Sequence, residues 1–179
     1  MSVALRLADP DGTYASVRLA SDLPLDDARR SFARNGDGWK LELELPERLQ
    51  RLEYKLEVEH ADGGTEHICD PGNEKRAPGA FGEKSVLELP GYEAPAWLDA
   101  ETVPGRTEEV SIRGRGLGAH VDIRVWTPAA AEPRQPLRLL LANDGPEYDQ
   151  LSNLTRFVAA KIAAEELPPL RVALLAPGD

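Results

Sequence analysis

The stretch LRLLLANDGPEYDQLSNLTRFVAAK, residues 137–161, contains in order a nearly continuous apolar run, a charged turn and an amphipathic pattern. An apolar run without alternation is typical of a strand that is covered on both faces, as in a parallel sheet. After the turn, Leu151, Leu154, Val158 and Ile162 follow one another at intervals of three or four residues. This spacing places them on one face of a single helix. The stretch therefore predicts the strand, turn and helix of an α/β domain.

The residues on either side extend this domain over 107–179. Two prolines end the helix, and RVALLAP at 171–177 is a second apolar strand. A strand, a helix and a strand in this order predict a parallel crossover. Towards the N-terminus, the alternating segments 107–113 and 119–128 predict an antiparallel hairpin, and the proline- and glycine-rich residues 93–106 predict a linker. We expect about four strands and one helix in the domain.

The first 92 residues follow a different pattern, with period two. WKLELELP at 39–46 and LEYKLEVEH at 52–60 alternate apolar and charged residues, and turn signals such as DPDG, NGDG and ADGG separate segments of this kind. Alternation predicts antiparallel strands with one buried face. Residues 1–92 are therefore expected to form an all-β, immunoglobulin-like sandwich of about seven strands, with Trp39 and Tyr54 inside it.

Composition and charge restrict the class of protein. The chain has 179 residues, of which 41% are hydrophobic and 29% charged, as in soluble globular proteins. Its formal net charge of −10 argues against a nucleic-acid partner. The apolar runs are too short to span a membrane, and the N-terminus lacks the apolar core of a signal peptide. Cys69 is the only cysteine, which excludes an internal disulfide and favours a reducing bacterial cytoplasm.

The histidines and glycines predict neither a metal site nor a cofactor. HxH and HExxH spacings are absent and Cys69 supplies one thiolate, whereas a zinc site needs three or four protein ligands. The glycines of GRGLG at 114–118 suggest a phosphate loop, but such a loop opens a helix, and here strands are predicted on both sides. We expect a hairpin turn instead. The histidines are His60, His67 and His120.

No serine has the surroundings of an activated nucleophile. A GxSxG nucleophile lies on a sharp turn between a strand and a helix. Ser85, Ser111 and Ser152 lack that context. The spacing of residues in this chain therefore predicts no catalytic triad.

The aromatic residues leave two interpretations of the first domain open. A row of exposed rings would stack on sugars, which would make the sandwich a non-catalytic binding module for a glycan or a protein partner. Trp39 and Tyr54, however, stand in alternating strands, where large rings pack in the core. Core packing is the more economical role for both.

Five segments, taken together, resemble one known family. EYKLEVEHADG, DPGN, FGEKS, LPGY and NDGPEYD occur in this order, and their combination resembles the enterochelin-esterase-like, esterase-D-like proteins. The resemblance covers the chain from about Trp39 to Asp179. It implies an N-terminal sandwich of the E-set type, related in fold to glycogen-type carbohydrate-binding modules. It also implies that the first part of an α/β-hydrolase domain follows.

The resemblance further implies that this chain has no catalytic residue of its own. In that family the serine nucleophile, the acid and the histidine lie on strand five and beyond. The segments at 108–114, 120–128, 137–143 and 170–177 resemble strands one to four. We therefore expect an N-terminal fragment of a serine esterase, truncated before the nucleophile elbow and inactive by itself.

One part of the catalytic machinery would nevertheless lie in the turn NDGPEYD. An oxyanion-hole N–H in α/β hydrolases comes from the loop after strand three. The candidates are Asp144, Gly145 and Glu147, because Pro146 has no N–H to donate. The alternative is an ordinary solvent-exposed turn in which Asp149 caps the helix.

Two hypotheses on partners follow from the resemblance. The whole enzyme would hydrolyse a small carboxylic ester, of the catecholate-siderophore type. Within the protein, the strand at 137–143 is apolar on both faces and would lie at the edge of the sheet. Such an edge recruits another strand, so we expect it to pair with the missing C-terminal half of the hydrolase or with a second copy of the chain.

Overall fold

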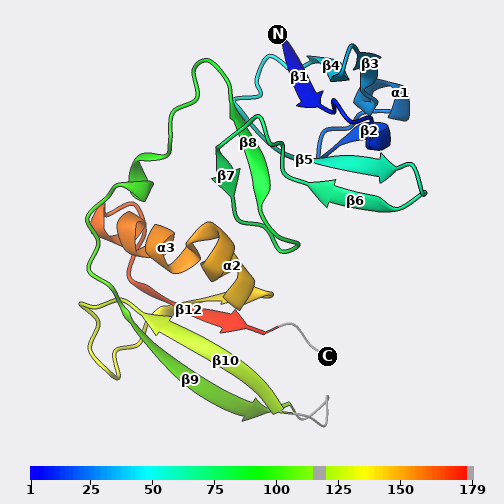
Figure 1. Cartoon of the computed structure of the whole chain (residues 1–179). Helices are drawn as coiled ribbons and strands as arrows, with labels where there is room; N and C mark the ends of the chain where they lie inside the picture. Colours follow the sequence, from blue (N-terminus) through cyan, green and yellow to red (C-terminus); the bar gives the residue numbers. More distant parts are fainter. Residues whose placement is uncertain (115–119, 177–179) are drawn as a thin grey trace. The chain divides into compact units, whose positions relative to one another are not determined.

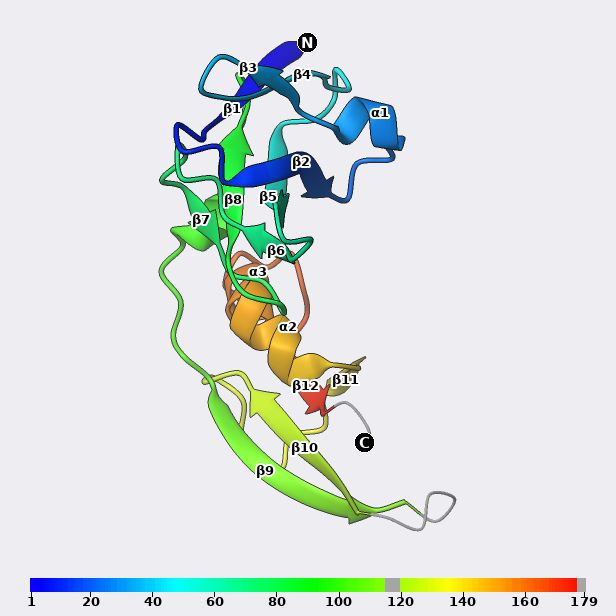
Figure 2. The same ribbon diagram turned by 45° about the vertical axis from the view of Figure 1, so that its right-hand side comes forward.

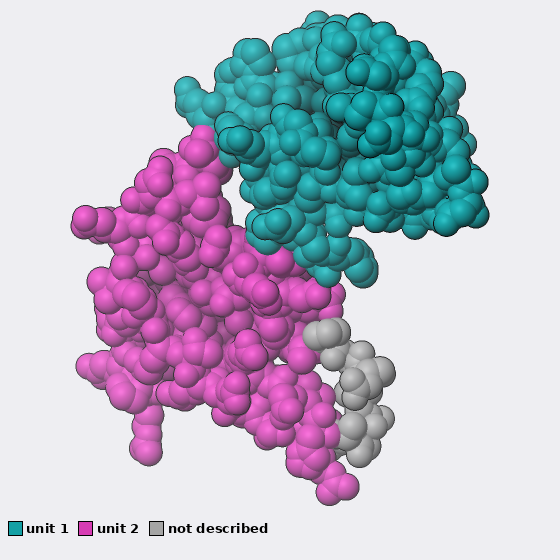
Figure 3. Space-filling view, viewed as in Figure 1, with its two compact units in different colours: residues 1–93 teal, residues 94–179 magenta. Residues whose placement is uncertain are grey.

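The computed structural model describes residues 1–114 and 120–176. It divides into two compact units, Met1–Glu93 and Ala94–Asp179 (Figure 3). Gly116 and Gly118 of the predicted hairpin turn lie outside the described residues. In the part of the chain that is described, no helix combines the length and the apolar character that crossing a membrane requires.

Two antiparallel sheets form the first unit, as expected of a β-sandwich (Figures 1 and 2). One sheet has the strand order β1-β4-β3, and the other has the order β2-β5-β8-β7, with β6 paired to β5. The elements of this unit are β1 (Ser2–Ala8), β2 (Tyr14–Ser21), α1 (Asp27–Arg30), β3 (Ala33–Asn35), β4 (Gly38–Glu44), β5 (Arg51–His60), β6 (Thr65–Ile68), β7 (Arg76–Ala77) and β8 (Lys84–Glu88).

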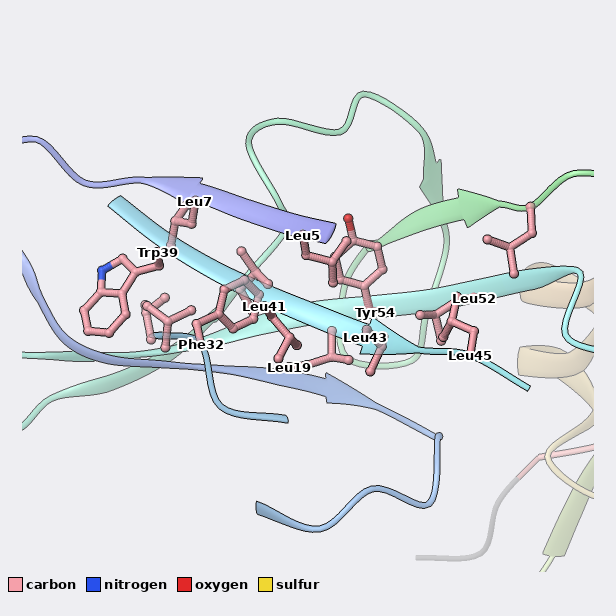
Figure 4. Packing of buried hydrophobic residues seen from close by; sticks show 14 residues of the cluster. Leu5, Leu7, Leu19, Phe32, Trp39, Leu41, Leu43, Leu45, Leu52 and Tyr54 are labelled. Atoms are coloured by element: carbon pink, nitrogen blue, oxygen red, sulfur yellow. The ribbon is translucent and has the colours of Figure 1, made fainter. Parts of the chain in front are cut away.

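The alternating positions of four strands make one apolar core between these sheets (Figure 4). The side chains of Trp39 and Tyr54 are 8% and 1% exposed, so the prediction that both are buried is confirmed. Their burial excludes them as a sugar-stacking platform. The strand residues of the core are Leu5 and Leu7 of β1, Val17 and Leu19 of β2, Trp39, Leu41 and Leu43 of β4, and Leu52, Tyr54, Leu56 and Val58 of β5.

Two buried aspartates accept hydrogen bonds from the aromatic residues of this core. Asp9 follows β1, and its carboxylate accepts hydrogen bonds from Trp39 Nε1 at 3.0 Å and from the Thr13 N–H at 2.7 Å. The Arg34 guanidinium lies 3.0 Å from the same carboxylate and over the Trp39 ring. Burial acts to raise the pKa of Asp9. The hydrogen bonds from Trp39, Thr13 and Tyr14 and the charge of Arg34 oppose it, so the pKa lies below its ordinary value.

Asp70 has the same role after β6. Its carboxylate accepts a hydrogen bond from the Tyr54 hydroxyl at 2.6 Å and from the Gly72 N–H at 2.8 Å. Burial, together with the hydrogen bond to Asp70, raises the pKa of Tyr54 well above its ordinary range. The Asn73 amide donates to the Val86 carbonyl at 2.8 Å. The DPGN turn thus places polar partners where the core would otherwise leave the Tyr54 hydroxyl unpaired.

The second unit contains a four-stranded mixed sheet with the order β11-β12-β10-β9. β9 and β10 pair antiparallel, and β11 and β12 pair parallel, so both pairings predicted from the sequence are confirmed. The elements are η1 (Ala96–Leu98), β9 (Arg106–Arg113), β10 (His120–Thr127), β11 (Arg138–Ala142), α2 (Gly145–Ser152), α3 (Leu154–Ala163) and β12 (Leu170–Leu175).

The prediction of one helix between β11 and β12 is wrong, because the structure has two. Asn153 adopts a left-handed conformation, with φ 52° and ψ 44°, and ends α2. The Asp149 carboxylate then accepts hydrogen bonds from the N–H and the hydroxyl of Thr155, at 2.8 and 2.6 Å. Asparagine tolerates this backbone conformation better than most residues. The apolar spacing continues across the break, which is why periodicity alone predicts a single helix.

The helices cover one face of the sheet. Trp126, Val172 and Leu174 form a core with Val158 of α3 on that side, and Figures 1 and 2 show α2 and α3 together there. Residues that pair across strands lie on the same face of a sheet. The pairs Val110–Ile123 and Ile112–Val121 of the hairpin, and Leu141–Ala173 of the parallel strands, therefore lie together on the opposite face.

Several large apolar side chains on this opposite face are open to solvent. Val110 and Ile112 are exposed, and Leu139 and Leu141 of β11 are 57% and 63% exposed. Leu140 points to the helical side and is also exposed. Leu139, Leu140 and Leu141 of β11 are thus all exposed, and among the described residues only β12 pairs with this strand.

The segment predicted as a linker contains η1, which packs within the second unit. The Trp97 ring meets the Phe157 ring edge to face, with centroids 5.3 Å apart. The Arg156 guanidinium donates a hydrogen bond to the Leu98 carbonyl at 2.6 Å. These contacts fasten the segment to α3.

The lowered pKa of Asp9 leads to a prediction about acid stability. A carboxyl group whose pKa is lower in the folded protein stabilises the fold above its unfolded pKa of about 4. This contribution is lost as the pH falls through the folded pKa. We expect the free energy of unfolding in urea to decrease below about pH 5, and to decrease less steeply in Asp9→Asn. Asp11→Asn, in the same turn but exposed, is the control, and equal pH profiles for the two variants would contradict the prediction.

Candidate functional site

The turn between β11 and α2 is the candidate site. β11 ends at Ala142 and α2 begins at Gly145, so the turn lies at the carboxyl end of a parallel strand. Ligands of open α/β sheets bind at this end of the strands. The predicted site residues Asp144, Gly145 and Glu147 are brought together here because they share the turn and the first helical residues.

Asp144 gives the turn its shape. Its backbone is left-handed, with φ 51° and ψ 30°, and its side chain makes no capping hydrogen bond to α2. The Asp144 carbonyl accepts the Tyr148 N–H at 3.0 Å, which closes the first turn of the helix. An aspartate at an N-cap usually binds the N–H groups that follow it. Here the carboxylate is exposed instead, so the helix terminus is not occupied by its own side chain.

Gly145 sets the distance between α2 and β12. It is buried, and a Cβ atom on it would lie 2.4 Å from the Leu174 Cα and 2.7 Å from the Leu174 Cβ. The first of these atoms belongs to the backbone of β12 and cannot rotate away. Only glycine therefore lets the start of α2 lie directly on β12.

Few backbone donors remain in the first turn of α2. The first N–H groups of a helix have no partner within it. Pro146 has no N–H, and the Tyr148 N–H is bonded to Asp144. Among the described residues, the N–H groups of Gly145 and Glu147 have no hydrogen-bond partner, and they lie at the end where the helix dipole favours negative charge. This arrangement suits an oxyanion that develops in a transition state.

Two cavities border the turn. One of about 380 Å³ lies between Pro146, Leu174 and the hairpin residues Ser111, Asp122 and Arg124. A smaller one of about 240 Å³ is lined by residues of the turn and of α2: Asp144, Glu147, Tyr148, Leu151 and Ser152. The Arg124 guanidinium lies 3.7 Å from the Glu109 carboxylate. A small ligand at the turn would thus meet polar walls on the hairpin side.

Asp149, which was expected to cap the helix after the turn, caps the following helix instead. Asp149 does cap a helix, but the helix is α3, through Thr155. The start of α2 itself has no side-chain cap. The capping interpretation therefore accounts for Asp149 but not for the first turn of α2.

The remaining candidate residues do not join this site in a catalytic arrangement. Ser85 is fully buried, and its hydroxyl accepts the Asp70 N–H at 2.8 Å. Ser152 ends α2 and is exposed. Ser111 Oγ lies 3.4 Å from His120 Nδ1 on the exposed hairpin, which is too long for a strong hydrogen bond. Among the described residues, no three histidine, cysteine, aspartate or glutamate side chains converge as metal ligands.

Sequence reasoning missed the contact between Ser111 and His120. The register pairs Ser111 with Asp122 and Arg113 with His120, so the two residues are diagonal neighbours. Alternation in the sequence shows which face a residue occupies but not which residue stands opposite. The hairpin register would have to be known in advance to find this pair.

Comparison with known proteins reveals similarity of fold. No family model and no curated protein matches the chain. The enterobactin esterase FES of Shigella flexneri, in the presence of enterobactin, matches with a TM-score of 0.69 and 20% identity over 99% of this chain and 52% of its own. The ferric enterobactin esterase of Salmonella typhimurium matches with a TM-score of 0.74 and 18% identity over 99% and 54%. The chain thus spans about half the length of these esterases.

Replacing Gly145 by alanine tests the close approach of α2 to β12. The added methyl group would collide with backbone atoms, and overpacking of this kind costs about 1–3 kcal/mol of stability. We expect Gly145→Ala to lower the free energy of unfolding by that amount in urea titrations. Glu147→Ala changes an exposed side chain in the same turn and should stay within about 0.5 kcal/mol of the wild type. Equal stabilities of the two variants would mean that α2 does not rest on β12.

Proposed function

We propose that this chain is the N-terminal portion of a serine esterase, in which a β-sandwich precedes the first part of an α/β-hydrolase domain. The strand order β11-β12-β10-β9 carries the proposal. In the α/β-hydrolase order, strand three lies on the far side of strand four from strand two. β11 occupies that place beside β12. The similarity in fold to two enterobactin esterases supports this assignment.

The nucleophile, the acid and the histidine of the esterase are supplied by residues outside these 179. No GxSxG elbow occurs in the sequence. Ser85 is buried, and Ser111 and Ser152 are not on a turn between a strand and a helix. The single cysteine suits a cytoplasmic enzyme.

The turn after β11 contributes donors to the oxyanion hole. The Gly145 and Glu147 N–H groups lie at the start of α2, where Pro146 and the bonded Tyr148 N–H take no part. Negative charge on the carbonyl oxygen of an ester appears only in the transition state. Donors that are already in place therefore accelerate acyl transfer without binding the substrate more tightly.

The substrate is a small carboxylic ester, of which a siderophore ester is the leading candidate. The similar esterases carry enterobactin in their names. The family resemblance suggests the class of ester. Because one fold serves many substrates, the particular compound is selected by the substrate pocket, which includes residues outside this chain.

Strand β11 is the place where the rest of the hydrolase joins. Its edge has no partner strand within the described residues, and Leu139 and Leu141 are exposed on the bare face of the sheet. A further strand would pair with this edge and its neighbouring helix would cover the bare face. A second copy of this chain is the alternative partner for the same edge.

Esterase assays on the natural full-length protein test the proposed activity. We expect it to hydrolyse enterobactin, and a fluorophosphonate probe to label a serine outside these 179 residues. Glu147→Pro removes one N–H from the turn and should lower kcat by about 10²–10³-fold with little change in KM. Glu147→Ala keeps the N–H and should retain activity. Labelling of a serine within this chain, or equal kcat values for the two variants, would refute the corresponding part of the proposal.

The 179-residue chain alone should associate through β11. Exposed apolar edges pair with one another, and a charge on the edge prevents this. We expect light scattering after size-exclusion chromatography to detect dimers or larger species, and Leu141→Lys to yield monomers. Val103→Lys changes an exposed apolar residue outside the sheet and should still associate. A wild-type monomer with slow amide exchange from Leu139 to Leu141 would contradict the expectation.

A further inference from the structure

The loop between β7 and β8 (Figure 1) contains Phe81, whose ring is almost completely exposed. The Phe81 side chain is 95% exposed, the highest value among the exposed large hydrophobic residues of the described chain. A single exposed apolar residue is common and needs no explanation. Phe81 differs because its backbone is fixed and a cavity lies beside it.

Hydrogen bonds hold the loop in one shape. The Gly82 N–H donates to the Gly79 carbonyl at 3.1 Å, which closes a turn with Phe81 as its third residue. Lys55 Nζ donates to the Phe81 carbonyl at 2.7 Å. Gly82 has a φ of +86°, a conformation that favours glycine. These hydrogen bonds connect the turn to β5 and place the Phe81 backbone beside the cavity described next.

A cavity of about 760 Å³ lies between this loop and the outer face of the five-stranded sheet. Its wall includes Glu53 and Lys55 of β5. Both alternate with the core residues Leu52 and Tyr54 and therefore point away from the core. The volume lies within the range of small-molecule sites, about 300–1,000 Å³.

The charged groups in the cavity offset one another. Lys84 Nζ lies 3.7 Å from the Glu53 carboxylate, and Lys55 is bonded to a carbonyl. Ser21, Asp22 and His67 complete the polar lining. A ligand of either charge would be attracted by some of these groups and repelled by others. A neutral ligand with many hydroxyl groups satisfies both kinds, because each hydroxyl donates one hydrogen bond and accepts others.

We propose that the Phe81 loop and the outer face of β5 bind a neutral saccharide. The apolar C–H face of a sugar ring packs on the Phe81 ring, where water is released from both surfaces. The hydroxyl groups bind Glu53 and Asp22 as acceptors and Lys84 and Lys55 as donors. This site uses none of the buried aromatic residues of the sandwich, and it is independent of the proposed esterase activity.

The test titrates the full 179-residue chain, labelled with ¹⁵N, with four neutral oligosaccharides: maltoheptaose, cellohexaose, xylohexaose and chitohexaose. At least one should bind saturably and shift the amide resonances of Ala80, Phe81 and Lys55. Phe81→Ala should weaken that binding about tenfold or more. Phe81→Trp keeps an aromatic face and should retain it.

Two comparisons decide the outcome. Val103→Ala removes an exposed apolar side chain outside the strands and helices of the other unit and should leave the affinity unchanged. Trigalacturonate, an anionic saccharide, should bind more weakly than the best neutral one. The proposal is overturned if none of the four neutral oligosaccharides binds, if Phe81→Ala binds as the wild type does, or if trigalacturonate is preferred.

Discussion

Contact between Gly145 and the backbone of Leu174 is the constraint on which the second unit depends. With a hydrogen atom in place of a side chain, α2 starts against β12, and any Cβ would lie 2.4 Å from the Leu174 Cα. The first turn of the helix therefore lies at the carboxyl ends of β11 and β12. The left-handed Asp144 is what turns the chain from β11 into this position. The positions of the Gly145 and Glu147 N–H groups and of the cavities beside the turn depend on this contact between Gly145 and Leu174.

Buried aspartates have the comparable role in the sandwich. Asp9 and Asp70 each begin an Asp-Pro turn after a strand, and each accepts a backbone N–H of its own turn. Each also accepts a hydrogen bond from a core aromatic residue, Trp39 or Tyr54. A large ring can be buried with its polar atom only if that atom finds a partner. The two turns thereby connect the alternating strands to a core that contains a tryptophan and a tyrosine.

The open face of the second sheet connects the fold to the proposed function. Trp126, Val172 and Leu174 are covered by α3, whereas Leu139 and Leu141 on the other face are exposed. Parallel strands are normally covered on both faces. A sheet that is apolar on both faces and covered on one is suited to receive further structure. In the proposed esterase, further strands and helices would complete the sheet, and the turn after β11 would then face the remaining catalytic groups.

Local patterns in the sequence determined the main strands of both units and the pairing types of the second sheet. The alternation of WKLELELP and LEYKLEVEH predicts the sandwich strands with Trp39 and Tyr54 inside, and the apolar runs around β11 and β12 predict a parallel pair. The family resemblance pointed to Gly145 as a candidate but not to its closeness to Leu174. Only the tertiary structure decided that closeness, the partners of Asp9 and the break at Asn153. A strand or helix pattern is set by residues that are neighbours in the chain. The closeness of Gly145 and Leu174 depends on the packing of α2 on β12. The partners of Asp9 are brought together by the register of the sheet. The break at Asn153 depends on the Asp149 side chain, which accepts the Thr155 N–H in place of a helical carbonyl.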